Sequence, residues 1–127
     1  MLEWRSAMNL LIVDDEYLVV EEVVTVTDWE LLGITEIYSA TNAVSAVRIL
    51  NEKKFDIMIC DIEMPQTDGL ELSKKAKENF PDLEIVMLTS HAEFNYVRNA
   101  LRYGCYDYLL KPVMEDDIIK VMKNSCH

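Results

Sequence analysis

Short apolar runs alternate along this chain with segments in which apolar residues recur at helical spacing. The continuous runs are residues 10–13, 57–60, 85–88 and 108–110. Because such runs suit strands covered on both faces, they predict the buried strands of a parallel sheet. Residues 34–40 mix apolar and polar positions, and they predict a strand at an edge of that sheet.

Between these runs, apolar residues three or four positions apart would share one face of a helix. Such residues are Ala43, Val47 and Leu50; Phe94, Val97 and Leu101; and Ile118, Val121 and Met122. Residues 17–29 are ambiguous, because their valines and threonines favour a strand locally, yet Val19, Val23 and Val26 would share a helical face. We expect a helix there, since burial of that face overrides local propensity.

Strand and helix therefore alternate five times, which predicts an α/β fold with a doubly wound parallel sheet. The length of 127 residues suits a single domain with one sizeable core. We expect residues 1–7 to be a leader added before a natural start at Met8, and residues 8–127 to be the domain.

Charge and composition narrow the functional classes. Acidic residues outnumber basic ones by 23 to 12, for a formal net charge of −11, so direct binding to nucleic acid is disfavoured. No apolar run approaches the roughly 20 residues of a membrane span. The three cysteines lack CxxC spacing, which predicts reduced thiols in a cytoplasmic protein and neither a disulfide framework nor a zinc site.

Polar residues follow four of the predicted strands. They are Asp14 and Asp15, Asp61, Thr89 and Ser90, and Lys111 with Pro112. In an open parallel sheet, right-handed crossovers bring the carboxyl ends of all strands to the same edge. We therefore expect three carboxylates, two hydroxyl groups and one ammonium group to converge at that edge.

Three neighbouring carboxylates are costly to hold together unless a cation lies among them. Mg²⁺ is the expected cation, because it is hard and prefers oxygen ligands. No histidine or cysteine is placed to favour zinc, since Cys60 should point away from Asp61 on its strand. Of Asp14 and Asp15, one would ligate the metal directly and the other would hold its water shell.

Each of these residues also has an ordinary structural explanation. The acidic pair after the first strand could complement a helix dipole, and Asp61 could lie in a turn. Thr89 could cap the next helix, Lys111 could form a surface salt bridge, and Tyr108 could belong to the core. Matching groups at four separate strand ends favour the functional interpretation.

Four motifs occur in order along the chain: VDDE, DIEMPQTDGLEL, MLTSH and YDYLLKPV. Together they resemble the receiver (CheY-like) domain of a bacterial two-component response regulator, from Met8 to about Lys123. The resemblance implies a five-stranded parallel sheet in the order 2-1-3-4-5 with helices on both faces. The stretches TVTDWELLGI and SHAEFNYVRNALRYGCYDYLLKPV further resemble receivers attached to AraC-type DNA-binding output domains, by analogy.

The resemblance implies a role for each matching site residue. Asp61 would accept a phosphoryl group from a sensor histidine kinase. Mg²⁺ would be held by the side chains of Asp14, Asp15 and Asp61 and by the backbone carbonyl group of Glu63. Lys111 would neutralise phosphoryl oxygens, since a carboxylate attacking a phosphate must overcome anion–anion repulsion.

The resemblance also implies a conformational switch. Thr89 would bond to the phosphoryl group, Tyr108 would move in response, and the peptide bond before Pro112 would be cis. The altered surface would comprise the fourth helix, the last strand and the last helix, roughly residues 91–103 and 106–121.

The expected activity is limited to Mg²⁺-dependent phosphorylation and dephosphorylation of the chain itself. The implied partners are a sensor histidine kinase and, only through an output domain, DNA; no membrane partner is expected. Homodimer formation on phosphorylation stays open, because Tyr96 and Tyr103 could face a second copy or lie in half-buried core.

Two rival classes have related folds or chemistry. A phosphohydrolase of the haloacid-dehalogenase type needs its nucleophile in a DxD stretch after the first strand, where this chain has adjacent acids. A flavodoxin-like FMN carrier needs a Ser/Thr- or Gly-rich phosphate cradle in the same loop. A purely structural interaction domain would leave the convergent acids unexplained.

Overall fold

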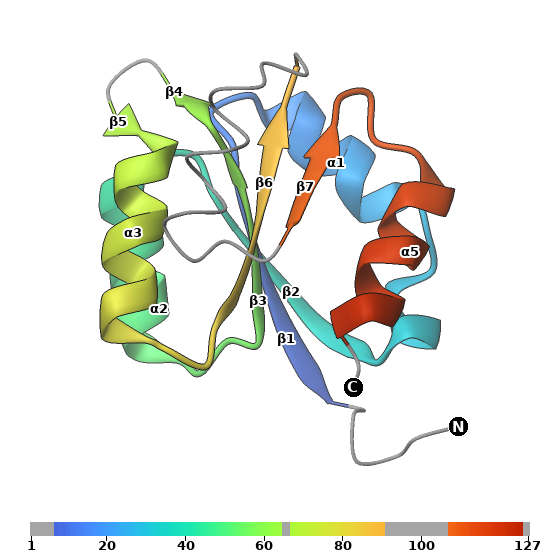
Figure 1. Ribbon diagram of the computed structural model, residues 1–127, viewed down its shortest axis with the longest axis horizontal. Coiled ribbons are helices and arrows are strands. Elements are labelled where there is room, and N and C mark those ends of the chain that lie inside the picture. Colours follow the sequence, from blue (N-terminus) through green and yellow to red (C-terminus); the bar gives the residue numbers. More distant parts are fainter. Residues whose placement is uncertain (1–6, 65–66, 91–106, 126–127) are drawn as a thin grey trace.

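A computed structural model describes residues 7–64, 67–90 and 107–125 and shows a central sheet with helices on both faces (Figure 1). Its five strands are all parallel in the order β2-β1-β3-β6-β7. Their bounds are β1 Met8–Val13, β2 Ile34–Ala40, β3 Ile57–Asp61, β6 Glu84–Thr89 and β7 Asp107–Leu110. Because β6 and β7 are the fourth and fifth strands of this sheet, the predicted order 2-1-3-4-5 is confirmed.

The helices lie on two sides of the sheet, with α1 and α5 on one side and α2 and α3 on the other (Figure 1). Their bounds are α1 Tyr17–Thr25, α2 Ala43–Glu52, α3 Gly69–Asn79 and α5 Glu115–Ser125, with a 3-10 turn, η2, at Trp29–Leu32. A short antiparallel pair, β4 Glu63–Met64 and β5 Thr67–Asp68, follows β3. The helix expected around residues 94–101 lies outside the described residues.

The continuous apolar runs are explained by burial on both faces of the sheet. Leu11, Met58 and Cys60 belong to the hydrophobic cluster beneath α2 and α3, whereas Leu10 and Ile59 belong to the cluster beneath α1 and α5. Successive side chains of a strand point to opposite faces, so a strand buried on both faces has no room for polar positions. This confirms the prediction for β1 and β3.

The last strand departs from that pattern. Only Leu109 of β7 is buried, whereas Tyr108 and Leu110 are each 40% exposed. Because β7 pairs with β6 alone, it lies at an edge of the sheet. The inference that residues 108–110 are covered on both faces is therefore wrong, while the edge position expected for β2 is confirmed.

The helix predicted over residues 17–29 is confirmed but is shorter, and its predicted face is confirmed at Val23 and in part at Val19 and Val26, which are partly buried against the same cluster. It ends at Thr25, whose hydroxyl group donates to the Glu21 carbonyl oxygen at 2.8 Å. The buried valines are Val20 and Val23, whereas Val26 is only half-buried. The chain then turns back, because the buried indole nitrogen of Trp29 donates to the Val23 carbonyl oxygen at 2.9 Å.

The predicted buried face is confirmed for α5 but not for α2. In α2 the buried residues are Ala46 and Leu50, and Val47 is 44% exposed, so the expected face is displaced. In α5 the expected Ile118, Val121 and Met122 are all buried. None of the described helices combines the length and apolar character that a membrane span requires.

Candidate functional site

The carboxyl ends of the sheet strands bring together the side chains that the sequence predicted to converge. Asp14 follows β1, Asp61 is the last residue of β3, Thr89 is the last residue of β6, and Lys111 follows β7. Two backbone hydrogen bonds fix the flanking loops: Asp14 N–H donates to the Ala40 carbonyl oxygen at 3.1 Å, and Lys111 N–H donates to the Thr89 carbonyl oxygen at 2.7 Å.

Lys111 lies between two buried carboxylates. Its Nζ is 3.0 Å from Asp14 Oδ2 and 3.5 Å from Asp61 Oδ1. The Lys111 side chain is 14% exposed, and those of Asp14 and Asp61 are 0% and 5% exposed. The ammonium group therefore offsets part of the repulsion that two desolvated carboxylates would otherwise experience.

The charges at this site are not balanced. Burial, followed by the negative charge of Asp14, raises the pKa of Asp61 to about 6, although Lys111 and the Glu63 N–H act in the opposite direction. Burial lowers the pKa of Lys111, but its pairing with Asp14 and the charge of Asp61 outweigh that effect, so this pKa is raised overall. Burial is thus the main cause of the Asp61 shift, whereas the Lys111 shift comes from its pairing with the neighbouring carboxylates.

The acidic residues after β1 fit the ligand set of a hard cation. One carboxylate oxygen each from Asp14, Asp15 and Glu16 lies within 4.8 Å of the others. Asp14 Oδ1 accepts a hydrogen bond from Glu16 N–H at 2.9 Å. Asp14 Oδ2 is buried and lies 3.0 Å from Lys111 Nζ, so a metal at this carboxylate would share it with the ammonium group. Glu16 is a nearby acid that the sequence analysis quoted only as part of VDDE.

The backbone that carries Asp61 depends on a glycine that the sequence analysis did not single out. Gly69 N–H donates to the Ile62 carbonyl oxygen at 3.1 Å. A Cβ atom at Gly69 would overlap the Asp61 carbonyl oxygen and lie 2.9 Å from the Ile62 carbonyl oxygen. The Asp-Gly pair before a helical pattern was the available signal, but it reveals a turn and not the neighbouring backbone.

Glu63 and Ser90 border the site in different ways. Glu63 N–H donates to Asp61 Oδ1 at 3.3 Å, while the Glu63 side chain is exposed. Ser90 is exposed, whereas the neighbouring Thr89 is only 1% exposed. Thr89 ends the strand that pairs with the strand of Asp61, and its bond to a group on Asp61 stays a prediction.

The structure tests only some of the features predicted for the switch. Tyr108 lies in register with Met87, and its side chain is 40% exposed. The peptide bond between Lys111 and Pro112 is cis, as expected. Tyr96, Tyr103 and the rest of residues 91–106 lie outside the described residues.

Comparison with protein families gives one match across most of the chain. The family model of the response regulator receiver domain matches residues 10–123 of this chain. An uncharacterized transcriptional regulatory protein of Bacillus subtilis, YesN, is 36% identical over 115 residues, which cover 91% of this chain and 31% of that protein. The transcriptional regulatory protein CitT of the same species is 34% identical over 93 residues, or 73% of this chain and 41% of CitT.

Solved structures show the same fold. The receiver domain of AraT, a response regulator from Geobacillus stearothermophilus, has a TM-score of 0.86 and 29% identity, covering 94% of this chain and 92% of that one. A two-component transcriptional regulator, AraC, from Clostridium phytofermentans has a TM-score of 0.80 and 25% identity, with coverage of 94% and 91%. This chain spans between 31% and 52% of the length of YesN and a second Bacillus subtilis regulator, YhcZ.

Proposed function

Because this chain belongs to the receiver domain family of two-component response regulators, we propose that Asp61 is its phosphoacceptor and that phosphorylation controls a transcriptional output. The observation that carries this proposal is the buried arrangement of Asp61, Asp14 and Lys111, with Lys111 Nζ 3.0 and 3.5 Å from the two carboxylates. The arrangement presents a nucleophilic carboxylate beside a fixed positive charge, which is what transfer of a phosphoryl group to an anion requires.

The phosphoryl transfer would proceed by displacement at phosphorus. A carboxylate oxygen of Asp61 forms a bond to phosphorus as the bond from phosphorus to the donor nitrogen of a kinase histidine breaks. The electron pair of that bond leaves with the imidazole. Lys111 pairs with a phosphoryl oxygen, and the fixed position of the carboxylate lowers the entropic part of the barrier.

A divalent cation suits the same carboxylates. Asp14, Asp15 and Asp61, with the backbone carbonyl group of Glu63, would hold Mg²⁺, and the clustering of carboxylate oxygens from Asp14, Asp15 and Glu16 within 4.8 Å of one another supports a cation there. Bound there, Mg²⁺ would supply further neutralisation of phosphoryl charge. The activity we propose is confined to phosphorylation and dephosphorylation of the chain itself.

The consequence of phosphorylation would be a shift between two surface states. The Thr89 hydroxyl group would bond to the new phosphoryl oxygen, and Tyr108 would turn inward from its half-exposed position. Such a bond changes the relative populations of two conformations. The affected surface would include β7 and α5, together with residues 91–103.

The proposed partners follow from the family and from the relatives. A sensor histidine kinase would be the phosphodonor, and an AraC-type output domain elsewhere in a longer cytoplasmic regulator would contact DNA. A homodimer of the phosphorylated form is an outcome that sedimentation of the modified protein would detect.

The decisive test is phosphorylation by a small donor. Incubation with phosphoramidate and Mg²⁺ should add one phosphoryl group by intact mass, and Asp61→Asn should add none. Glu63→Gln is the matched control, because the Glu63 side chain is exposed and its backbone N–H makes the hydrogen bond to Asp61, and this variant should be modified like the parent. Equal modification of Asp61→Asn would show that the acceptor lies elsewhere.

A further inference from the structure

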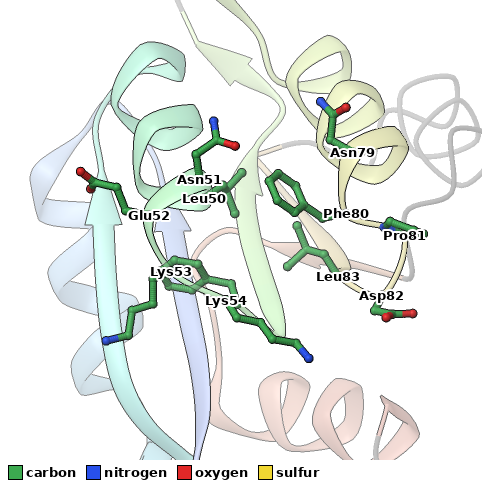
Figure 2. Close-up of a pocket in the computed structure, with 11 residues that line it drawn as sticks. Leu50, Asn51, Glu52, Lys53, Lys54, Asn79, Phe80, Pro81, Asp82 and Leu83 are labelled. Carbon is green, nitrogen blue, oxygen red and sulfur yellow. The ribbon is translucent and has the colours of Figure 1, made fainter.

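A cavity lies at the amino ends of β3 and β6, away from Asp61, and has no part in the proposed phosphoryl chemistry. It occupies about 460 Å³ between two segments, residues 50–55 and residues 79–83. The first segment leads from the end of α2 into β3, and the second leads from the end of α3 into β6. Figure 2 shows the side chains that line it.

The interior of this cavity is apolar. Leu50, Phe80 and Leu83 point toward one another across it (Figure 2). Leu50, Phe55 and Leu83 are 4%, 6% and 2% exposed, whereas Phe80 is half-buried. The volume falls within the range of roughly 300–1,000 Å³ that small-molecule sites occupy, so a ring of moderate size would fit.

The walls of the cavity are held in place by contacts within the protein. On one side, Lys77 Nζ donates to the Leu83 carbonyl oxygen at 2.8 Å, and Leu83 N–H donates to the Phe80 carbonyl oxygen at 3.0 Å. On the other side, the Phe55 ring packs edge-on against Tyr38 with centroids 5.4 Å apart. A preformed cavity costs little ordering entropy when a ligand binds.

The charged residues at the rim differ in what they can offer a ligand. Lys53 is paired with Glu36 at 2.8 Å, but the Lys54 ammonium group has no ion-pair partner among the residues that the structure describes. The carboxylate groups of Glu52 and Asp82 point away from the cavity, on opposite sides of it (Figure 2). Among the described residues, the Lys54 ammonium group is therefore a positive charge without an ion-pair partner beside the apolar interior of the cavity.

We propose that this cavity binds a small aromatic molecule with one anionic group, with the ring against Leu50, Phe80 and Leu83 and the anion at Lys54. Leu83 directly precedes β6, and Phe55 lies two residues before β3. The ligand would thus bind at the far ends of the two strands that carry Thr89 and Asp61. The proposal does not depend on phosphorylation of Asp61.

Two fluorescent probes that share their aromatic rings separate the apolar and ionic parts of this proposal. The anionic probe is 1-anilinonaphthalene-8-sulfonate, and its uncharged counterpart is N-phenyl-1-naphthylamine. We expect the sulfonate to bind the folded parent saturably at one site, with a Kd on the order of 10–100 µM. No saturable binding of the sulfonate in this range would overturn the proposal.

Two variants and one control variant assign the site. Lys54→Gln should weaken sulfonate binding about two- to fivefold and leave the uncharged probe unaffected, whereas Lys120→Gln, an exposed lysine of α5, should change neither. Phe80→Ala should weaken both probes about tenfold. Equal sulfonate affinity in the parent and in Lys54→Gln would overturn the ionic assignment.

Amide chemical shifts locate the probe independently of any variant. We expect saturating sulfonate to shift the amides of Leu50, Phe55 and Leu83. One competing apolar surface among the described residues is on α1, where Tyr17 and Leu18 are 61% and 72% exposed. Amide chemical-shift changes confined to Tyr17 and Leu18 would place the probe on α1 and overturn the proposal.

Discussion

The residues that surround Asp61 determine how readily its carboxyl group loses its proton. Its side chain is 5% exposed, and burial and the charge of Asp14 raise its pKa to about 6 against the opposing effect of Lys111. An exposed aspartate has a pKa of about 3.9. The folded protein without metal therefore holds a proton on Asp61 more tightly than the unfolded chain does, and a bound cation would compete with that proton.

This competition predicts a pH-dependent stability in the absence of Mg²⁺. Between about pH 4 and pH 6, the folded state binds more protons at Asp61 than the unfolded state, so the free energy of unfolding should fall as pH rises through that window. Asp61→Asn removes this contribution. Urea unfolding of both proteins should show the parent losing stability relative to the variant as the pH rises.

Taking the difference between parent and variant cancels the titration of other groups that the substitution leaves unchanged. Above about pH 6 the difference should level off, because Asp61 is then ionised in both states. A parent-minus-variant difference that stays constant from about pH 4 to pH 7 would contradict the raised pKa.

At the scale of elements, the start of α3 lies against the end of β3. Gly69 is the first residue of α3, and the space that its Cβ would need is occupied by the Asp61 carbonyl oxygen. Because that neighbour is backbone, it cannot move aside as a flexible side chain could. The position of Asp61 therefore depends on a residue that makes no contribution to the charge of the site.

Gly69→Ala should both destabilise the fold and slow phosphorylation. The added methyl group must push α3 away from β3 at a cost of about 1–3 kcal/mol, and the loop that carries Asp61 should shift with it. Urea unfolding and the initial rate of modification by phosphoramidate measure the two effects. Glu78→Ala, at an exposed position near the end of the same helix, is the control, and parent-like behaviour of Gly69→Ala would refute the contact.

Local sequence patterns predicted the elements well where every position of an element is buried. They predicted them poorly where contacts with another element determine where an element ends. The strand at 57–60 is apolar at every position, and its short length favoured a buried strand over a buried helix. The end of α1 depends on the indole of Trp29 bonding back to Val23, a contact that the valine-rich pattern cannot express. Gly69 was missed for the same reason, because its neighbour belongs to another element.

At the scale of the whole molecule, the sequence predicted the site at the carboxyl ends of the strands but not the cavity at their amino ends. The convergence of Asp14, Asp61 and Lys111 follows from the handedness of parallel crossovers, which fixes where every strand ends. The cavity at the amino ends depends on how the ends of α2 and α3 pack, as with Leu50 and Phe80. No pattern along the chain specifies that packing, so the cavity became apparent only in the structure.

The last prediction concerns communication across the molecule from Asp61 to the surface of β7. Thr89 is buried at the end of β6, next to β7, whose Tyr108 is 40% exposed. Thr89→Ala leaves Asp61 and Lys111 in place, so modification by phosphoramidate should continue. The shift of the Tyr108 amide on phosphorylation should become markedly smaller, because the hydroxyl group that senses the phosphoryl oxygen is gone.

Ser90→Ala is the matched control for this prediction, since Ser90 is the adjacent hydroxyl residue but is exposed. It should show the full Tyr108 shift at the same level of phosphorylation. A parent-sized shift in Thr89→Ala would mean that Tyr108 responds through another route, for instance through the Lys111 backbone, whose N–H donates to the Thr89 carbonyl oxygen at 2.7 Å. That bond survives the substitution, so the experiment separates the side chain of Thr89 from its backbone as the carrier of the coupling.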